Sequence, residues 1–319
     1  MNKKFRWLAY TVVITIVAYG IWIGVQDQEE IYDAIAKIGI PGFLFLCLFS
    51  TFNYVIRYVR WKYFLHQLGD EVQFWDGLMC YIAGFALTTT PAKAGEVVRS
   101  VYFKRRQGIS YNHTLSCLLT ERTMDALVSA LVGILALYTF EKVRWIGVAF
   151  TLCIIVVVIL ISRHDVLLRI IDWMRVIKVR TLSRLLDAVT VFLDRAKELF
   201  RLKTFTLGMI LGLVAWSAEG LAFAWLAQQL GGQASTLLYV SIFCIALVVG
   251  SMTLLPGGLG GTEIVLYMLT VASGLGTTEA LTASLLIRLA TLWYAVFLGL
   301  LSMLWLGSND ESSLPSNTE

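Results

Sequence analysis

Runs of apolar residues long enough to cross a lipid bilayer recur along the chain, and they leave few possible folds. A helix needs about 20 predominantly apolar residues to span the hydrocarbon core, where only helices and closed barrels satisfy their backbone polar groups. Of the 319 residues, 58% are hydrophobic and 15% charged, whereas soluble domains carry about 25% charged residues. The sequence therefore predicts an all-α polytopic integral membrane protein with six full spans, at about 7–25, 41–58, 123–140, 145–162, 205–228 and 282–306.

Two further apolar regions, 76–112 and 237–273, are each interrupted near the middle. The first break runs from Pro91 to Glu96, and the second, PGGLGGTE, from Pro256 to Glu263. Proline ends a helix and glycine readily adopts positive φ, so each break predicts a turn between two short helices, the later one restarting near Thr262. If 76–112 simply crossed the membrane, its basic cluster would lie outside, against the positive-inside rule. We therefore expect two re-entrant helical hairpins, which bring the total to about eight transmembrane segments.

Lysine and arginine placement sets the orientation, with both termini in the cytoplasm and Arg57 and Arg60 at the cytoplasmic end of the second span. Each half then reads span, span, hairpin, span, with opposite orientations. The spacing from Gly95 to Arg122 equals that from Gly261 to Arg288, and Leu-Leu precedes both arginines. These patterns predict an inverted-topology repeat within one domain, 1–306, with repeat one at about 5–140 and repeat two at about 145–306.

The remaining segments lie outside the predicted bundle. Residues 163–203 carry basic side chains and an apolar helical face, which is typical of an amphipathic helix at the cytoplasmic membrane surface or of a loop helix packed on the bundle. The polar tail 307–319 is predicted to be disordered in the cytoplasm. The pair Gly208-x-x-x-Gly212 predicts close helix packing.

Ionisable residues in and beside the apolar regions are the candidate site. A charge inside a membrane costs about 3 kcal/mol and is usually paired or lines a polar path. We expect Glu96 to pair with Arg122 and Glu263 with Arg288, and the exposed N–H groups at the hairpin helix starts to favour an anion. The candidate substrate-binding residues are Glu96, Arg99, Glu121, Arg122, Asp125, Glu219, Glu263 and Arg288, with hairpin turns at Pro91, Gly95, Pro256, Gly257, Gly258 and Gly260.

Simpler explanations exist for several of these residues. Glu121, Arg122 and Asp125 could be solvated charges near a helix start. Glu219 could make a helix–helix hydrogen bond through a protonated carboxyl group. Arg99, like Lys93, could extend its side chain to the cytoplasm.

The sequence offers no pattern for a metal or another cofactor. Its five cysteines lie in or beside apolar runs without a Cys-x-x-Cys pair, and its three histidines lack the spacing of metal ligands. The formal charge of +4 arises from short basic loops, so no nucleic-acid partner is expected.

The motifs PAKAGEVVRSVYFKRR, TERTMDALV and LPGGLGGTE resemble the transmembrane-region family of the bacterial lysylphosphatidylglycerol synthases, over about residues 5–306. Pro91, Gly95, Glu96 and Arg99 match one element of that family, and Pro256, Gly257, Gly258 and Gly260 match another. The resemblance implies a flippase-like domain that moves a polar lipid between leaflets of a bacterial cytoplasmic membrane. Because the chain ends soon after the last span, the synthase's aminoacyl-transferase domain is expected to be absent, which weakens the case for lysylphosphatidylglycerol itself as the substrate.

Three functions are compatible with these features. The leading expectation is a lipid flippase rather than an enzyme. Its expected ligands are anionic or zwitterionic lipids, and its candidate partners are a second copy of the chain and a separately encoded lipid-modifying enzyme. A membrane-embedded transferase with Asp27, Glu29 and Glu30 on an outer loop is the second, although catalytic motifs for it are missing. The third is a non-transporting assembly partner of an envelope enzyme.

Overall fold

The computed structural model describes residues 28–90, 96–140, 197–253 and 255–311, and this part of the chain consists of helices joined by short loops, without strands. The expectation of an all-α membrane protein is confirmed at that level. In chain order the elements are α2 Gln28–Gln67, α3 Phe74–Ala83, η1 Gly84–Leu87, α4 Val98–Gln107, α5 Tyr111–Thr139, α9 Leu202–Gln229, α10 Thr236–Met252, η4 Pro256–Gly258, α11 Gly261–Ala272, α12 Thr277–Arg288, η5 Leu289–Trp293 and α13 Tyr294–Glu311.

Three helical segments of the described chain are long and apolar enough to cross a membrane, Ile35–Gln67, Leu202–Gln229 and Thr277–Ser308. The first is kinked at Gly39, whose φ of 63° is outside the helical region, and continues from Pro41. Proline suits a helix start because its missing N–H would be unpaired there. The predicted spans at 41–58, 205–228 and 282–306 therefore correspond to real helices, the first of them nine residues longer than expected at its carboxyl end.

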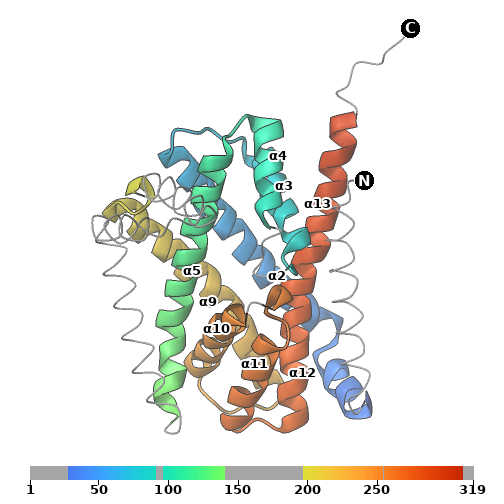
Figure 1. Ribbon diagram of the computed structural model, residues 1–319. Helices are drawn as coiled ribbons and strands as arrows, with labels where there is room; N and C mark the ends of the chain where they lie inside the picture. Colours follow the sequence, from blue (N-terminus) through green and yellow to red (C-terminus); the bar gives the residue numbers. More distant parts are fainter. Residues whose placement is uncertain (1–27, 91–95, 141–196, 254, 312–319) are drawn as a thin grey trace, which may run out of the picture.

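The two interrupted regions form helical hairpins of short elements. The first consists of α3, η1 and α4, and the second of α10, η4 and α11. Figure 1 shows α3 and α4 in the upper half of the molecule and α10 and α11 in the lower half, so the hairpins approach its middle from opposite ends. The predicted helix restart near Thr262 is confirmed, because α11 begins at Gly261.

The second hairpin turns on glycines with left-handed backbone. Gly257, Gly258 and Gly260 have φ values of 63°, 68° and 80°, which side chains with a Cβ rarely adopt. The turn also touches the first hairpin, since a Cβ placed on Gly257 would lie 3.6 Å from the Cα of Thr89. The glycine turn of the second hairpin therefore lies against the segment that follows η1 in the first.

Close helix packing brings the remaining elements around the hairpins. α2 packs along α9, α10 packs on α5 and α9, and α13 packs against α3 and η1. Gly299 of α13 is in contact with the backbone of Phe85 and Ala86, because its missing side chain leaves room for η1. Gly208 and Gly212 of α9 likewise leave room for Phe64 and Arg60, as their spacing predicts.

Several boundaries differ from the expectations or lie beyond the described residues. α5 begins at Tyr111, twelve residues before the predicted span, because Ser110 caps it by accepting a hydrogen bond from the His113 N–H. α13 continues to Glu311 into the predicted tail. Glu29 and Glu30, expected on an outer loop, belong to the first turn of α2. The predicted spans 7–25 and 145–162, the turn residues Pro91 and Gly95, and nearly all of 163–203 lie outside the described residues.

Candidate functional site

Two arginines of α2 are buried in the bundle. Arg57 and Arg60, which the charge pattern assigns to the cytoplasmic end of the second span, expose only 6% and 0% of their surface. They lie on one face of a helix that continues to Gln67, and both turn towards α5. The charge pattern places these two arginines at the end of the span and does not predict their burial.

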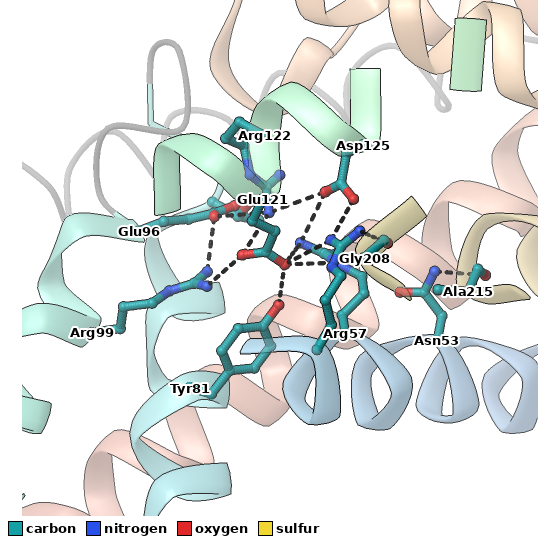
Figure 2. A network of polar contacts seen from close by, with 12 residues as sticks. Asn53, Arg57, Tyr81, Glu96, Arg99, Glu121, Arg122, Asp125, Gly208 and Ala215 are labelled. Carbon is teal, nitrogen blue, oxygen red and sulfur yellow. Dashed lines mark hydrogen bonds and ion pairs between the residues drawn. The ribbon is translucent and has the colours of Figure 1, made fainter. Parts of the chain in front are cut away.

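Glu121 of α5 is the acceptor at the centre of a polar network drawn from four helices (Figure 2). Its Oε1 accepts hydrogen bonds from Arg57 Nε at 3.1 Å and from the hydroxyl of Tyr81 on α3. Its Oε2 accepts from Arg99 Nη1 of α4 at 3.2 Å. One turn further along α5, Asp125 accepts from Arg60 Nη2 at 2.5 Å. The solvated-charge explanation for Glu121 and Asp125 is therefore wrong, since both are buried and lie ten and fourteen residues after the start of α5.

The first hairpin is joined to this network through Glu96 and Arg99. Arg99 Nη2 donates to Glu96 Oε2 at 2.8 Å, and Thr88 donates to Glu96 Oε1 at 2.8 Å. The guanidinium of Arg99 also lies over the ring of Tyr81, 4.4 Å from its centroid. Arg99 is completely buried, so the simpler explanation that it extends to the cytoplasm is wrong. Lys93, for which the same explanation was open, lies outside the described residues.

Arg122 is held more loosely than the other arginines of the network. Its Nη2 lies 3.5 Å from Glu96, 3.6 Å from Glu121 and 3.6 Å from Asp125. Neither Nε nor Nη2 forms a hydrogen bond with the described residues, and 27% of the side chain is exposed. The predicted Glu96–Arg122 pair is present, although Arg99 is the closer partner of Glu96.

The network carries more positive than negative charge. Four guanidinium groups, from Arg57, Arg60, Arg99 and Arg122, face three carboxylates, from Glu96, Glu121 and Asp125, within the described part of the chain. An uncompensated charge in a water-poor interior is costly and attracts a counterion. The network therefore favours an anion at its exposed edge, where Arg122 lies.

The second hairpin has a simpler ion pair. Arg288 Nε at the end of α12 donates to Glu263 Oε1 at 2.7 Å, which confirms the predicted pair. Its Nη2 donates to the carbonyl oxygen of Gly257 at 2.7 Å. Arg288 thus holds the glycine turn η4 against the start of α11.

A cavity of about 270 Å³ lies between the two charged units. Arg122 and Asp125 line it from α5, and Gly257, Gly258 and Arg288 line it from the second hairpin and α12. Trp216 of α9 also lines it, and the indole N–H of this buried side chain has no hydrogen-bond partner among the described residues. The other lining residues are Ala126, Ser129, Leu247, Val248, Ser251, Leu255 and Thr262.

The candidate residues therefore divide into three groups. Arg122, Asp125 and Arg288 line the cavity, and Gly257 and Gly258 line it from the turn. Glu96, Arg99, Glu121 and Glu263 lie behind these residues as ion-pair partners. Glu219 is buried on α9 outside the residues that line the cavity; its predicted protonated state stays a prediction.

Four residues were not identified as site residues from the sequence: Arg57, Arg60, Tyr81 and Trp216. The signal for the two arginines was their spacing of three residues in the run NYVIRYVRWKYF, which places both on one face of a helix. Tyr81 and Trp216 gave no such signal, because aromatic residues are common throughout this chain.

Comparison with known proteins places the chain among membrane proteins. The model of the family described as lysylphosphatidylglycerol synthase TM region matches residues 7–299. A UPF0104 membrane protein of Pyrococcus horikoshii is 23% identical, over 93% of this chain and 95% of its own length. Two UPF0104 membrane proteins of Methanothermobacter thermautotrophicus are 26% identical, over 93% of this chain and 92% of theirs, and 22% identical, over 96% and 97%. All three relatives are archaeal, so they lend no support to the expectation of a bacterial membrane.

Proposed function

Because the chain belongs to the family of the lysylphosphatidylglycerol synthase TM region, we propose that it is a lipid flippase, a transporter that moves a polar lipid between the two leaflets of the cytoplasmic membrane. The observation that carries the proposal is the cavity shared by the two hairpins, with Arg122 on one side and Arg288 on the other. A cavity with charged side chains in its wall, inside an apolar helical bundle, gives a lipid headgroup a path across the hydrocarbon core.

The placement of the two arginines also supports an inverted repeat. Arg122 and Arg288 follow Gly95 and Gly261 at the same spacing, each pairs with a glutamate of its own hairpin, and both line the cavity. Transporters built from inverted repeats bind substrate where the interrupted helices of the two repeats meet near the bilayer midplane. In this proposal, rocking of one repeat against the other opens the cavity to each leaflet in turn.

The glutamates take a different role from the one the sequence suggests. Glu96 and Glu263 are both buried and both bound to arginines, so we assign them to holding Arg99, Arg122 and Arg288 in place. Contact with the headgroup falls to the arginines and to the hydroxyl and indole donors of the cavity wall.

The test is lipid translocation in reconstituted vesicles. Purified protein is placed in vesicles with a trace of phospholipid that carries a reducible fluorophore on an acyl chain, and a membrane-impermeant reductant reports the fraction that reaches the outer leaflet. We expect faster exchange than in protein-free vesicles, and at least a tenfold slower exchange in Arg122→Gln. Arg201→Gln, at an exposed arginine on the flank of α9, is the matched control. Equal rates in protein-free vesicles and in vesicles with wild-type protein would rule out the flippase.

A further inference from the structure

We propose that the cavity selects an anionic phosphate headgroup without an ammonium group, so that the lipid it carries has a net negative charge. The inference rests on the proposed lipid transport and names its substrate class. It starts from the charges and donors that face the cavity.

Three side chains that line the cavity carry hydrogen-bond donors, Arg122, Arg288 and Trp216. The Arg122 side chain is 27% exposed, and its Nη2 lies no closer than 3.5 Å to the carboxylates around it. The hydrogen bonds of Arg288 use Nε and Nη2, which leaves Nη1 for a ligand. The indole N–H of Trp216 is a third donor. Guanidinium groups bind phosphate oxygens through several charge-assisted hydrogen bonds, so this set suits a phosphate.

The carboxylate that an ammonium group would need is surrounded by guanidinium groups. Among the described residues that line the cavity, Asp125 is the one carboxylate. Its Oδ1 accepts from Arg60, and its Oδ2 lies 3.7 Å from Arg57 and 3.6 Å from Arg122. A cationic headgroup would therefore meet a carboxylate that three guanidinium groups already neutralise.

The aromatic alternative for an ammonium group is also filled. Quaternary and primary ammonium groups bind over the face of a tryptophan, and Trp216 is the tryptophan that lines the cavity. The guanidinium carbon of Arg57 lies 5.2 Å from the centroid of that ring. The indole face is thus taken by a cation of the protein, while its N–H edge remains a donor.

The size of the cavity limits which anionic headgroups it can hold. About 270 Å³ lies at the lower end of the range for ligand pockets, which is about 300–1,000 Å³. A phosphate with a glycerol-sized substituent fits this space, and the hydroxyl groups of Ser129 and Thr262 can bind its oxygens.

The experiment measures ligand-induced thermal stabilisation of the purified full chain in detergent. The probes are phosphatidylglycerol, phosphatidylethanolamine and lysylphosphatidylglycerol with the same acyl chains, and inorganic phosphate as the free ion. A ligand that binds only the folded state raises the unfolding temperature in proportion to the logarithm of its concentration over Kd. We expect phosphatidylglycerol to stabilise the protein and the two amine-bearing lipids to bind at least tenfold more weakly.

Two variants tie that binding to the cavity. Trp216→Phe keeps the ring and removes the N–H, and it should weaken phosphatidylglycerol binding by roughly ten- to a hundredfold, the loss expected for a hydrogen bond to a charged group. Trp225→Phe, on the same helix but against Phe45, is the matched control and should bind as the wild type does. Arg122→Gln should abolish the phosphatidylglycerol effect.

The possible outcomes separate this inference from the proposed function. Equal binding of the amine-bearing lipids, or stabilisation by inorganic phosphate with none by phosphatidylglycerol, overturns the inference. If vesicles also show translocation of every lipid without preference, the result supports the proposed flippase function and contradicts its selectivity for anionic lipids. If phosphatidylglycerol binds selectively and no lipid is translocated, the inference stands and the proposed transport fails.

Discussion

Neutralising Glu121 should destabilise the whole protein, because this carboxylate holds together α2, α3, α4 and α5. Glu121→Gln removes one of three negative charges that face four arginines, so the formal excess of the network rises from one positive charge to two. A glutamine would also turn its amide NH₂ group towards either Arg57 or Arg99, whose own N–H groups lie 3.1 Å and 3.2 Å from the present oxygens. Two donors would then face each other in a buried site.

The magnitude follows from the known cost of breaking a buried ion pair, about 3–5 kcal/mol. Since 1 kcal/mol shifts the unfolding temperature of a domain of 150–250 residues by about 2–4 °C, we expect a drop on the order of 10 °C. The assay is thermal unfolding of the detergent-solubilised protein, followed by intrinsic tryptophan fluorescence. Glu71→Gln is the control, because Glu71 is 83% exposed and pairs only with His66, and exposed pairs contribute about 0–1 kcal/mol.

A compensating variant makes the reasoning refutable in a second way. Adding Arg57→Gln to Glu121→Gln returns the excess to one positive charge, and the double variant should recover part of the lost unfolding temperature. An unfolding temperature of Glu121→Gln equal to that of Glu71→Gln would refute the view that the carboxylate is a structural centre. Additive losses in the double variant would refute the charge-balance argument.

Three further predictions concern packing, hydrogen bonding and access. Gly299→Ala should cost about 1–3 kcal/mol of stability through overpacking against the backbone of Ala86. The control Gly307→Ala, in open space on the same helix, should leave the unfolding temperature unchanged or slightly higher. Equal effects of the two variants would argue against the close contact of α13 with η1. Tyr81→Phe removes a buried hydrogen bond to Glu121 and should lower the free energy of unfolding by about 1–3 kcal/mol. Thermal unfolding measures this loss, with Tyr63→Phe as the control. Equal unfolding temperatures of the two variants would show that Tyr81 does not stabilise the network. In a background without the native cysteines, Ser251→Cys should react with a small charged thiol reagent that enters through the cavity. The control Ser50→Cys, at a fully buried position, should not react. Modification of both variants would show that the reagent does not report on access to the cavity.

Much of the fold could be predicted from the sequence, because its signals are local. Apolar run lengths gave the helices near 41–58, 205–228 and 282–306, and Pro256 with its glycines gave the turn of the second hairpin. The start of α5 was missed because the first three turns of that helix, from Tyr111 to Arg122, are too polar to count as a membrane span. One face of those turns is buried by tertiary contacts, which hydropathy does not register.

The site was only half predictable for a related reason. The pair Glu263–Arg288 could be inferred because both residues sit where an apolar segment leaves no water, so each charge needs a partner. Arg57 and Arg60 lie near the end of an apolar run, where arginines usually extend to the membrane surface. Only the packing of α2 beside α5 and α9 distinguishes a buried arginine from an extended one at such a position.

Glu121 and Arg122 are adjacent on α5 but have different roles: the first stabilises the fold, and the second is assigned to ligand binding. Glu121 faces the interior and is 1% exposed, whereas the side chain of Arg122 is 27% exposed and reaches the cavity. Removing the charge of Glu121 increases the excess of positive charge in the network. Arg122→Gln has the opposite effect, because it leaves three positive charges facing three negative ones. Since Arg99 and Arg60 still bind Glu96 and Asp125 at 2.8 Å and 2.5 Å, Arg122→Gln should unfold at the wild-type temperature or above it. A residue whose removal improves charge balance and stability is retained for something other than stability, which is why loss of lipid binding in this variant can be attributed to the cavity and not to misfolding.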